Sequence, residues 1–171
     1  RKIAFIRGSP DSRPSQEREA GFRRAFEQEG IALEGDMAAG AGWRLEDGYQ
    51  AMRELLARES RYTAVFAASD LLALGAYQAI REAGLEVGKD ISVLGFDNIE
   101  LAAESLPPLS TVSVRRHEMG DTAARLLFES LDGGRGYPVR IVLPTVLVQR
   151  ASTVAVPAVK GAATPGVVRK P

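Results

Sequence analysis

Residues Val65 to Asn98 read VFAASDLLALGAYQAIREAGLEVGKDISVLGFDN. The stretch begins with an apolar strand, turns at Ser69-Asp70, continues as an amphipathic helix and ends in a second apolar strand that closes with Asp97-Asn98. Two parallel strands joined by a helix end at the same edge of a sheet, and ligands of open α/β sheets bind outside that edge. The stretch therefore brings these four polar residues to one candidate ligand site.

The same alternation of strand and helix continues on both sides of this unit. Apolar runs predict strands at residues 2–7, 31–37, 64–68 and 91–96. Apolar residues at helical spacing predict helices at residues 15–29, 45–59 and 70–83. Strands that alternate with helices form a parallel sheet with right-handed crossovers. The predicted fold class is therefore α/β, with a Rossmann-like parallel sheet flanked by helices.

The pattern changes after Pro107-Pro108, which form a rigid, extended break. The segments predicted beyond it are a strand at 111–114, a helix at 117–131 and a strand-like run at 139–148 that Pro144 interrupts. Residues 154–171 carry Pro, Gly, Ala and Val without periodicity, so we expect a disordered tail there.

The composition narrows the classes of partner and chemistry. Lys plus Arg and Asp plus Glu both number 22 in 171 residues, so the chain has no basic footprint for nucleic acid or an anionic membrane. It has no Cys and a single histidine, His117, which excludes thiolate chemistry and a histidine metal site. No nucleophile elbow, dinucleotide fingerprint or Walker loop occurs. We therefore expect no enzyme activity, no cofactor and no membrane association.

Further polar and aromatic residues are expected at the sheet edge that holds the four residues above. Arg18 lies early in the helix after the first strand, Trp43 precedes the second helix, and Ser12 lies in the turn-rich loop at residues 9–14. An Asp that accepts and an Arg that donates hydrogen bonds suit adjacent hydroxyls, while an aromatic face covers the C–H side of a pyranose. The set indicates a site for a sugar or a similar small polar molecule.

Each of these residues also has a plainer interpretation. Arg18 suits a solvated helix position between two glutamates, and Trp43 suits a loop residue that covers the core. Asp70 suits a helix N-cap, and Asp97 suits a residue that fixes a turn. The combined placement favours a ligand site over four separate structural roles.

Four ordered motifs resemble the lactose/galactose-repressor (LacI/GalR) family of bacterial transcription regulators over residues 1–153. They are REAGF at 18–22, AVFAASDLLALGA at 64–76, DISVLGFDN at 90–98 and PPLSTV at 107–112. The resemblance implies a periplasmic-binding-protein-like (type I) effector domain, in which two Rossmann-like subdomains close on a small molecule. The same blocks, taken singly, also occur in periplasmic sugar-binding proteins, and the proline pair favours the regulators.

The resemblance also implies how the chain is divided. Residues 1–112 correspond to the C-terminal subdomain, 113–136 to an excursion into the N-terminal subdomain, 137–153 to the return and 154–171 to the tail. The chain lacks an initiator Met, so we expect a piece of a longer protein whose DNA-binding domain lies upstream. The segment from Leu71 and the segment at residues 99–106 resemble the family's dimer surface.

The family's effector-binding positions are matched residue by residue. Arg18, Trp43, Asp70 and Asp97 match positions that hold the effector, and Ser69 stands where many members have Asn. Ser12 occupies a position that contacts the ligand in some members.

These matches imply the effector-binding, dimerising part of a cytoplasmic regulator that senses a sugar and binds operator DNA as a homodimer. The alternative is a periplasmic sugar-binding protein of a transporter, which the upstream sequence would distinguish from a regulator. An enzyme on a related scaffold is the weakest hypothesis, because no nucleophile–base pair is present.

Overall fold

A computed structural model describes residues 2–31, 37–58, 62–131 and 139–155. Its strands are β1 (Ile3–Ile6), β2 (Ala38–Ala39), β3 (Ala64–Ala67), β4 (Ser92–Asp97), β5 (Ser110–Ser113) and β6 (Val146–Val148). Its helices are α1 (Arg13–Gln28), α2 (Leu45–Ala57), α3 (Asp70–Glu82), α4 (Glu100–Glu104) and α5 (Arg116–Leu131).

The strands form one sheet in the order β2-β1-β3-β4-β5-β6. The first five strands pair in parallel, which confirms the predicted α/β class. β6 pairs antiparallel to β5, with Thr111 opposite Val148. β6 is antiparallel because the chain leaves the sheet after β5 and runs back along it.

The two faces of the sheet are covered unequally. Val65, Ala67 and Val93 point to the face under α2 and α3 and are at most 2% exposed. On the opposite face Phe22 of α1 stacks on Phe5 with ring centroids 5.3 Å apart. Phe66 shares that face and is only half-buried, because α1 does not extend across the sheet. The sheet therefore has one closed face and one partly open face.

Two glycines let α2 and α3 pack backbone to backbone. A Cβ on Gly75 would overlap the carbonyl oxygen of Leu45, and one on Gly48 would overlap the backbone of Leu72. This crossing holds the first turn of α3 against the carboxyl ends of β3 and β4. The position of the candidate site thus depends on a contact between the backbones of α2 and α3 that leaves no room for a side chain at either glycine.

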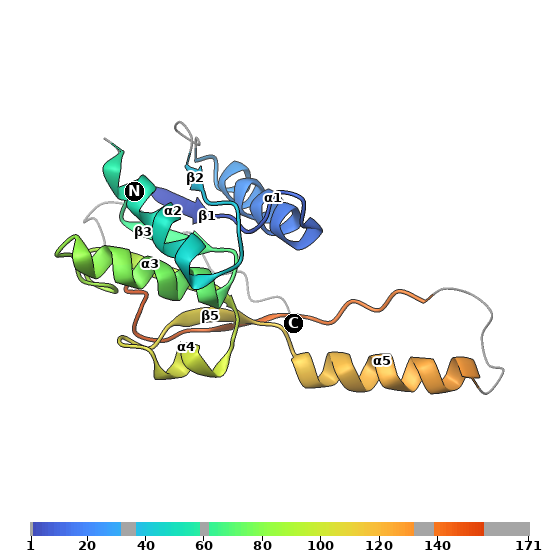
Figure 1. Cartoon of the computed structure of the whole chain (residues 1–171). Helices are drawn as coiled ribbons and strands as arrows, with labels where there is room; N and C mark the ends of the chain where they lie inside the picture. The colour runs from blue at the N-terminus through green and yellow to red at the C-terminus, as the bar shows by residue number, and fades with distance from the viewer. Residues whose placement is uncertain (1, 32–36, 59–61, 132–138, 156–171) are drawn as a thin grey trace.

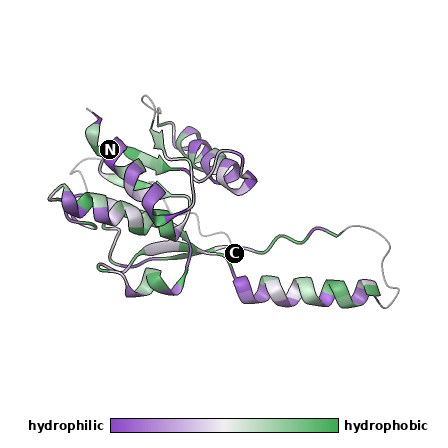
Figure 2. Ribbon diagram, viewed as in Figure 1, coloured by the Kyte–Doolittle hydropathy of each residue, from purple (hydrophilic) through white to green (hydrophobic). Residues whose placement is uncertain are grey.

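After β5 the chain leaves the sheet as an arm, which we define as residues 114–131 and 139–145. α5 and the returning segment run side by side away from the lobe (Figure 1). They enclose a groove of about 440 Å³ between Val114, Met119 and Leu126 on one side and Ile141 and Leu143 on the other. No residue of α5 is buried, although apolar residues recur along both segments (Figure 2).

Several element boundaries differ from the sequence-based predictions. The second strand of the structure is Ala38–Ala39, which pairs with β1, and Ile31 at the start of the predicted run 31–37 is exposed. Residues 32–36 of that run lie outside the described residues. The first helix begins at Arg13 and not at Ser15, with Pro14 in its first turn, where a missing N–H has no cost. Helix α4 was not predicted from the sequence.

The predictions at the C-terminal end have mixed outcomes. Only Val146–Val148 of the predicted run 139–148 is a strand, and β5 begins one residue earlier than predicted. The predicted helix at 117–131 is confirmed and begins one residue earlier, at Arg116. Residues 156–171 of the predicted tail lie outside the described residues.

The Gly75 contact gives a stability prediction. We expect Gly75→Ala to lower the free energy of unfolding by at least about 2 kcal/mol, because neither backbone can move away from the new methyl group. Gly21→Ala in α1 is the matched control, since a Cβ there meets nothing within 4 Å. It should raise stability by about 0.5–1 kcal/mol. Urea unfolding checks both, and equal effects would contradict the packing argument.

Candidate functional site

An arginine joins the carboxyl ends of two neighbouring strands. Arg18 Nη2 lies 3.3 Å from Asp97 Oδ1, and Arg18 Nη1 donates to the carbonyl of Ala68, just beyond β3. The side chains are 19% and 31% exposed, so this ion pair is partly shielded and still open to a ligand. The structure thus brings together two predicted site residues that are far apart in the sequence.

Two aromatic rings surround the guanidinium of Arg18. Its central carbon lies 3.9 Å from the centroid of Phe96 and 5.7 Å from that of Trp43. The Trp43 ring packs so closely on Gly8 that a Cβ there would overlap it. Glycine at the end of β1 therefore lets the tryptophan reach the sheet edge. We call Arg18, Trp43, Phe96 and Asp97 the carboxyl-edge cluster.

The turn after β4 has an unusual backbone. Asp97 has φ 111° and Asn98 has φ 54°, both in the region that non-glycine residues rarely adopt. Two main-chain amides of the turn donate to side chains. The amide of Asn98 donates to Thr111 Oγ1 at 3.3 Å, and the amide of Ile99 donates to Asp70 Oδ2 at 2.9 Å.

Asp70 is an internal support in this structure. It is fully buried, and its second oxygen accepts a 2.5 Å hydrogen bond from the hydroxyl of Thr111. Gly95 provides the space, because a Cβ there would overlap that carboxylate. Ser69 is the N-cap of α3 and accepts a bond from the amide of Leu72, so the interpretation of Asp70 as the cap was wrong.

Asn98 contacts three other parts of the chain. Its Oδ1 accepts a 2.9 Å bond from Arg150, its Nδ2 lies 3.4 Å from Ser113 Oγ, and its carbonyl accepts a 3.1 Å bond from Arg116. The side chain is thus engaged inside the fold.

Ser12 lies apart from the carboxyl-edge cluster. It occupies the N-cap position of α1 without a side-chain capping bond, and it is half-buried. Within the described residues, no side-chain hydrogen bond joins it to Arg18 or Asp97. The structure therefore groups Arg18, Trp43 and Asp97 and leaves Ser12 at the margin.

Sequence reasoning did not find Phe96, Thr111, Arg116 or Arg150. Alternation along β4 could have found Phe96, because it precedes Asp97 in a strand and must face away from Gly95. Nothing local marks Arg150, which meets Asn98 only because β6 returns to the sheet.

An apolar groove of about 590 Å³ adjoins the cluster on the partly open face of the sheet. Arg18, Phe22, Phe66, Phe96 and Val114 line it. Among the described residues, no group of His, Cys, Asp and Glu could hold a metal ion. No helix in the described ranges is long and apolar enough to cross a membrane.

Residues 1–153 match the model of a family described as a periplasmic binding protein-like domain. The ribose operon repressor of Escherichia coli K12 is 34% identical over 151 residues, which cover 88% of this chain and 46% of the repressor. The transcriptional regulator CelR of Thermobifida fusca is 38% identical over 152 residues, which cover 89% of this chain and 45% of CelR. The chain belongs to the LacI/GalR family. It represents part of the effector-binding domain of such regulators.

Solved structures agree with this assignment. A CelR–cellobiose complex matches with a TM-score of 0.85 and 38% identity over 89% of this chain and 46% of that chain. The lac repressor dimer bound to operator and the anti-inducer ONPF matches with a TM-score of 0.81 and 32% identity, over 90% and 53% of the two chains. The chain thus spans about half the length of its relatives. LacI/GalR regulators are transcription factors and not enzymes, as expected from the sequence.

The electrostatics of Asp97 give a pH prediction. Burial raises the pKa of Asp97, Arg18 opposes that rise, and the nearby Asp70 carboxylate adds to it. A carboxyl whose pKa is higher in the folded state stabilises the fold at low pH and loses that contribution as pH rises through the raised pKa.

We therefore expect the unfolding free energy of the wild type, relative to Asp97→Asn, to fall as pH rises from about 4. The variant has no titrating group at this position, so the difference isolates Asp97. Urea unfolding at a series of pH values measures it. A difference that rises with pH would mean that the Arg18 ion pair outweighs burial.

Proposed function

We propose that this chain is the effector-binding half of a sugar-responsive transcription regulator, with the carboxyl-edge cluster as its half of the sugar site. The observation that supports this most is the partly exposed Arg18–Asp97 pair beside the Trp43 ring. It combines a donor, an acceptor and an aromatic face at the sheet edge where ligands of α/β folds bind.

The chemistry of the cluster suits adjacent hydroxyl groups. The bond from Arg18 engages Asp97 Oδ1, so the carboxylate retains an oxygen that can accept from a sugar hydroxyl. A guanidinium has five donors in a fixed plane and can serve a second hydroxyl without losing its bond to Ala68. The ring of Trp43 then covers the C–H face of the sugar.

The other predicted site residues take supporting roles in this proposal. Asp70 and Asn98 use their polar side-chain atoms inside the fold, and Ser69 caps α3. We propose that Asp70 and Asn98 hold the turn after β4 in place and that Ser69 stabilises the start of the helix that carries Asp70. Ser12 contributes, at most, from the rim of the site through the N-cap of α1.

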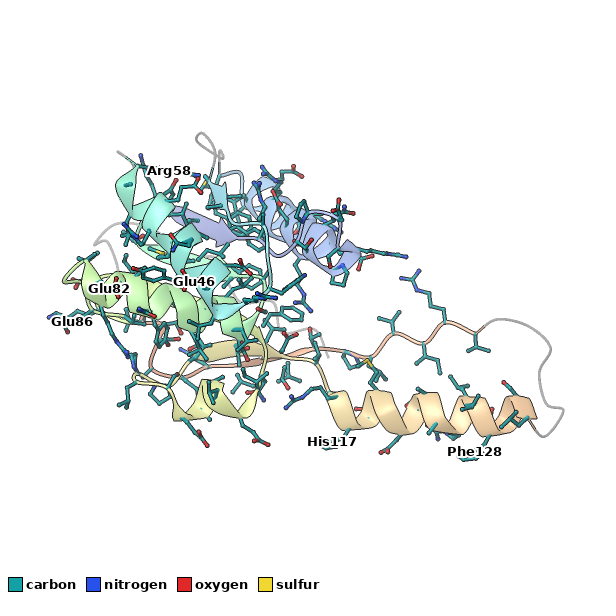
Figure 3. All side chains as sticks on the ribbon, in the orientation of Figure 1. Glu46, Arg58, Glu82, Glu86, His117 and Phe128 are labelled. Atoms are coloured by element: carbon teal, nitrogen blue, oxygen red, sulfur yellow. The ribbon has the colours of Figure 1, made fainter. Side chains whose placement is uncertain are left out.

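The arm supports the proposal that a second subdomain completes the site. Phe128 and Leu131 in α5 are 65% and 72% exposed, and Phe128 points away from the returning segment (Figure 3). Apolar surface of this extent on a helix calls for a covering partner. We assign residues 113–136 and 137–153 to the excursion into that subdomain and the return. The whole protein would act in the cytoplasm as an operator-binding homodimer.

Sugar binding is testable by isothermal titration calorimetry on the longer protein that contains this chain. D-ribose and cellobiose head the panel, because the relatives are named for ribose and cellobiose. We expect Arg18→Ala and Asp97→Ala each to weaken binding of the recognised sugar by at least tenfold, since each removes a charged partner of its hydroxyls.

Arg23→Ala is the matched control for Arg18→Ala. Arg23 lies on the same helix, pairs with Glu19 and is 47% exposed, and it should leave the affinity within twofold of wild type. Equal affinity for wild type, Arg18→Ala and Asp97→Ala would refute the assignment of the site.

Self-association is a separate prediction of the same proposal. Leu71 at the start of α3 and Leu101 in α4 are 41% and 51% exposed, and the Ile99–Asp70 bond holds these helix starts together. We expect Leu101→Glu to weaken the homodimer at least tenfold, because a charge would replace apolar contact. Ile31→Glu, at a 50% exposed position after α1, is the control. Analytical ultracentrifugation measures the dimer dissociation constants of both variants. Equal constants would contradict the assignment of Leu71 and Leu101 to the dimer surface.

A further inference from the structure

We infer that Arg150 is a positioning residue for the sugar site, because its guanidinium holds Asn98 and thereby the strained turn that aims Asp97. This inference rests on the proposed function only in treating that turn as part of the site. Arg150 itself lies beyond β6, in the segment that returns from the arm.

The turn needs external support. Asp97 and Asn98 are consecutive non-glycine residues with positive φ, a strained backbone conformation that persists only where the surroundings hold it. This backbone determines where the Asp97 carboxylate points, and hence whether it reaches Arg18 across the sheet edge. A relaxed turn would separate the acceptor and the donor of the proposed site.

Arg150 is built into the fold as a bridge to this turn. Its Nη1 donates to the carbonyl of Leu109 at 2.6 Å, and its Nη2 donates to Asn98 Oδ1 at 2.9 Å. The guanidinium therefore ties the residue before β5 to the residue after β4. Its own amide donates to Ser110 Oγ at 2.8 Å, which fixes the main chain from which it extends.

The segment that carries Arg150 is itself anchored. Ser152 is fully buried, donates to the carbonyl of Val93 at 2.6 Å and accepts from the amide of Ser110 at 2.7 Å. The amide of Val93 in turn donates to the carbonyl of Ser152 at 2.8 Å. This anchor lies at the opposite end of β4 from Asn98, so it provides an internal reference that is independent of the turn.

A second arginine, at the start of the arm, contacts the same asparagine. Arg116, the first residue of α5, donates to the carbonyl of Asn98 at 3.1 Å. The first helix of the arm and the segment that follows β6 therefore both bond Asn98. A movement of the arm relative to the lobe would act directly on the residue next to Asp97.

Amide hydrogen exchange without sugar tests the role of Arg150. We expect Arg150→Gln to speed exchange at the amides of Asn98 and Ile99 at least tenfold and to leave Val93 within twofold. Arg115→Gln is the matched control, because Arg115 bonds Glu118 on the exposed arm, and it should change none of these amides.

A single variant and a double variant distinguish a positioning role of Arg150 from a general loss of packing around it. Arg150→Lys alone should also speed exchange at Asn98 and Ile99, since a lysine cannot bridge Leu109 and Asn98 together. Adding Asn98→Asp supplies an anionic partner for that lysine and should restore both amides to within threefold of wild type. The affinity for D-ribose or cellobiose, whichever the wild type binds, should change in parallel. It should fall in Arg150→Lys and recover in the variant that also carries Asn98→Asp.

The inference is wrong if Arg150→Gln leaves both turn amides within twofold, if Val93 speeds up as much as they do, or if the double variant fails to restore them. Wild-type protein that binds no sugar in the panel would count against the proposed function alone, because exchange at the turn is measured without sugar.

Discussion

The buried carboxylate of Asp70 makes the hydrogen bonds on which the carboxyl edge of the sheet depends. It is fully buried and receives bonds from the hydroxyl of Thr111 and the amide of Ile99, so it links α3, β5 and the turn after β4. Burial raises its pKa, and the bonds from Thr111 and Ile99 oppose that rise. A buried carboxyl is tolerated only where such donors surround it.

Glycines make this arrangement sterically feasible. Gly95 leaves room for the Asp70 carboxylate, and Gly75 lets α3 approach α2 closely enough to place Asp70 over the sheet. Gly8, two residues beyond β1, serves the same purpose where it admits the Trp43 ring. The site is therefore assembled from close approaches of backbone, which a single methyl group would obstruct.

The arm differs from the lobe in how much apolar surface it exposes. The lobe has one closed face and a packed core, whereas α5 and the returning segment present apolar side chains to solvent. Arg116 at the start of the arm and Arg150 in the segment that follows β6 both bond Asn98. A movement of the arm relative to the lobe would therefore act on Asn98 through Arg116.

The sequence alone determined the strand and helix alternation, and with it the sheet edge at which Arg18, Trp43 and Asp97 would gather. Periodicity and turn residues are local properties, so they predicted these elements and placed the polar residues at strand ends. The short strand at Ala38–Ala39 and helix α4 escaped prediction, because two and five residues carry too little periodicity.

Only the tertiary structure decided which polar groups remain available to a ligand. Asp70 and Asp97 both stand at the carboxyl edge in the sequence pattern, yet one is fully buried and the other is 31% exposed on its side chain. That difference arises from Gly95, which leaves room for the Asp70 carboxylate, and from Thr111 on the neighbouring strand, which donates to it. No local sequence pattern encodes these contacts, because they form only when residues that are distant in the sequence are brought together in the folded sheet.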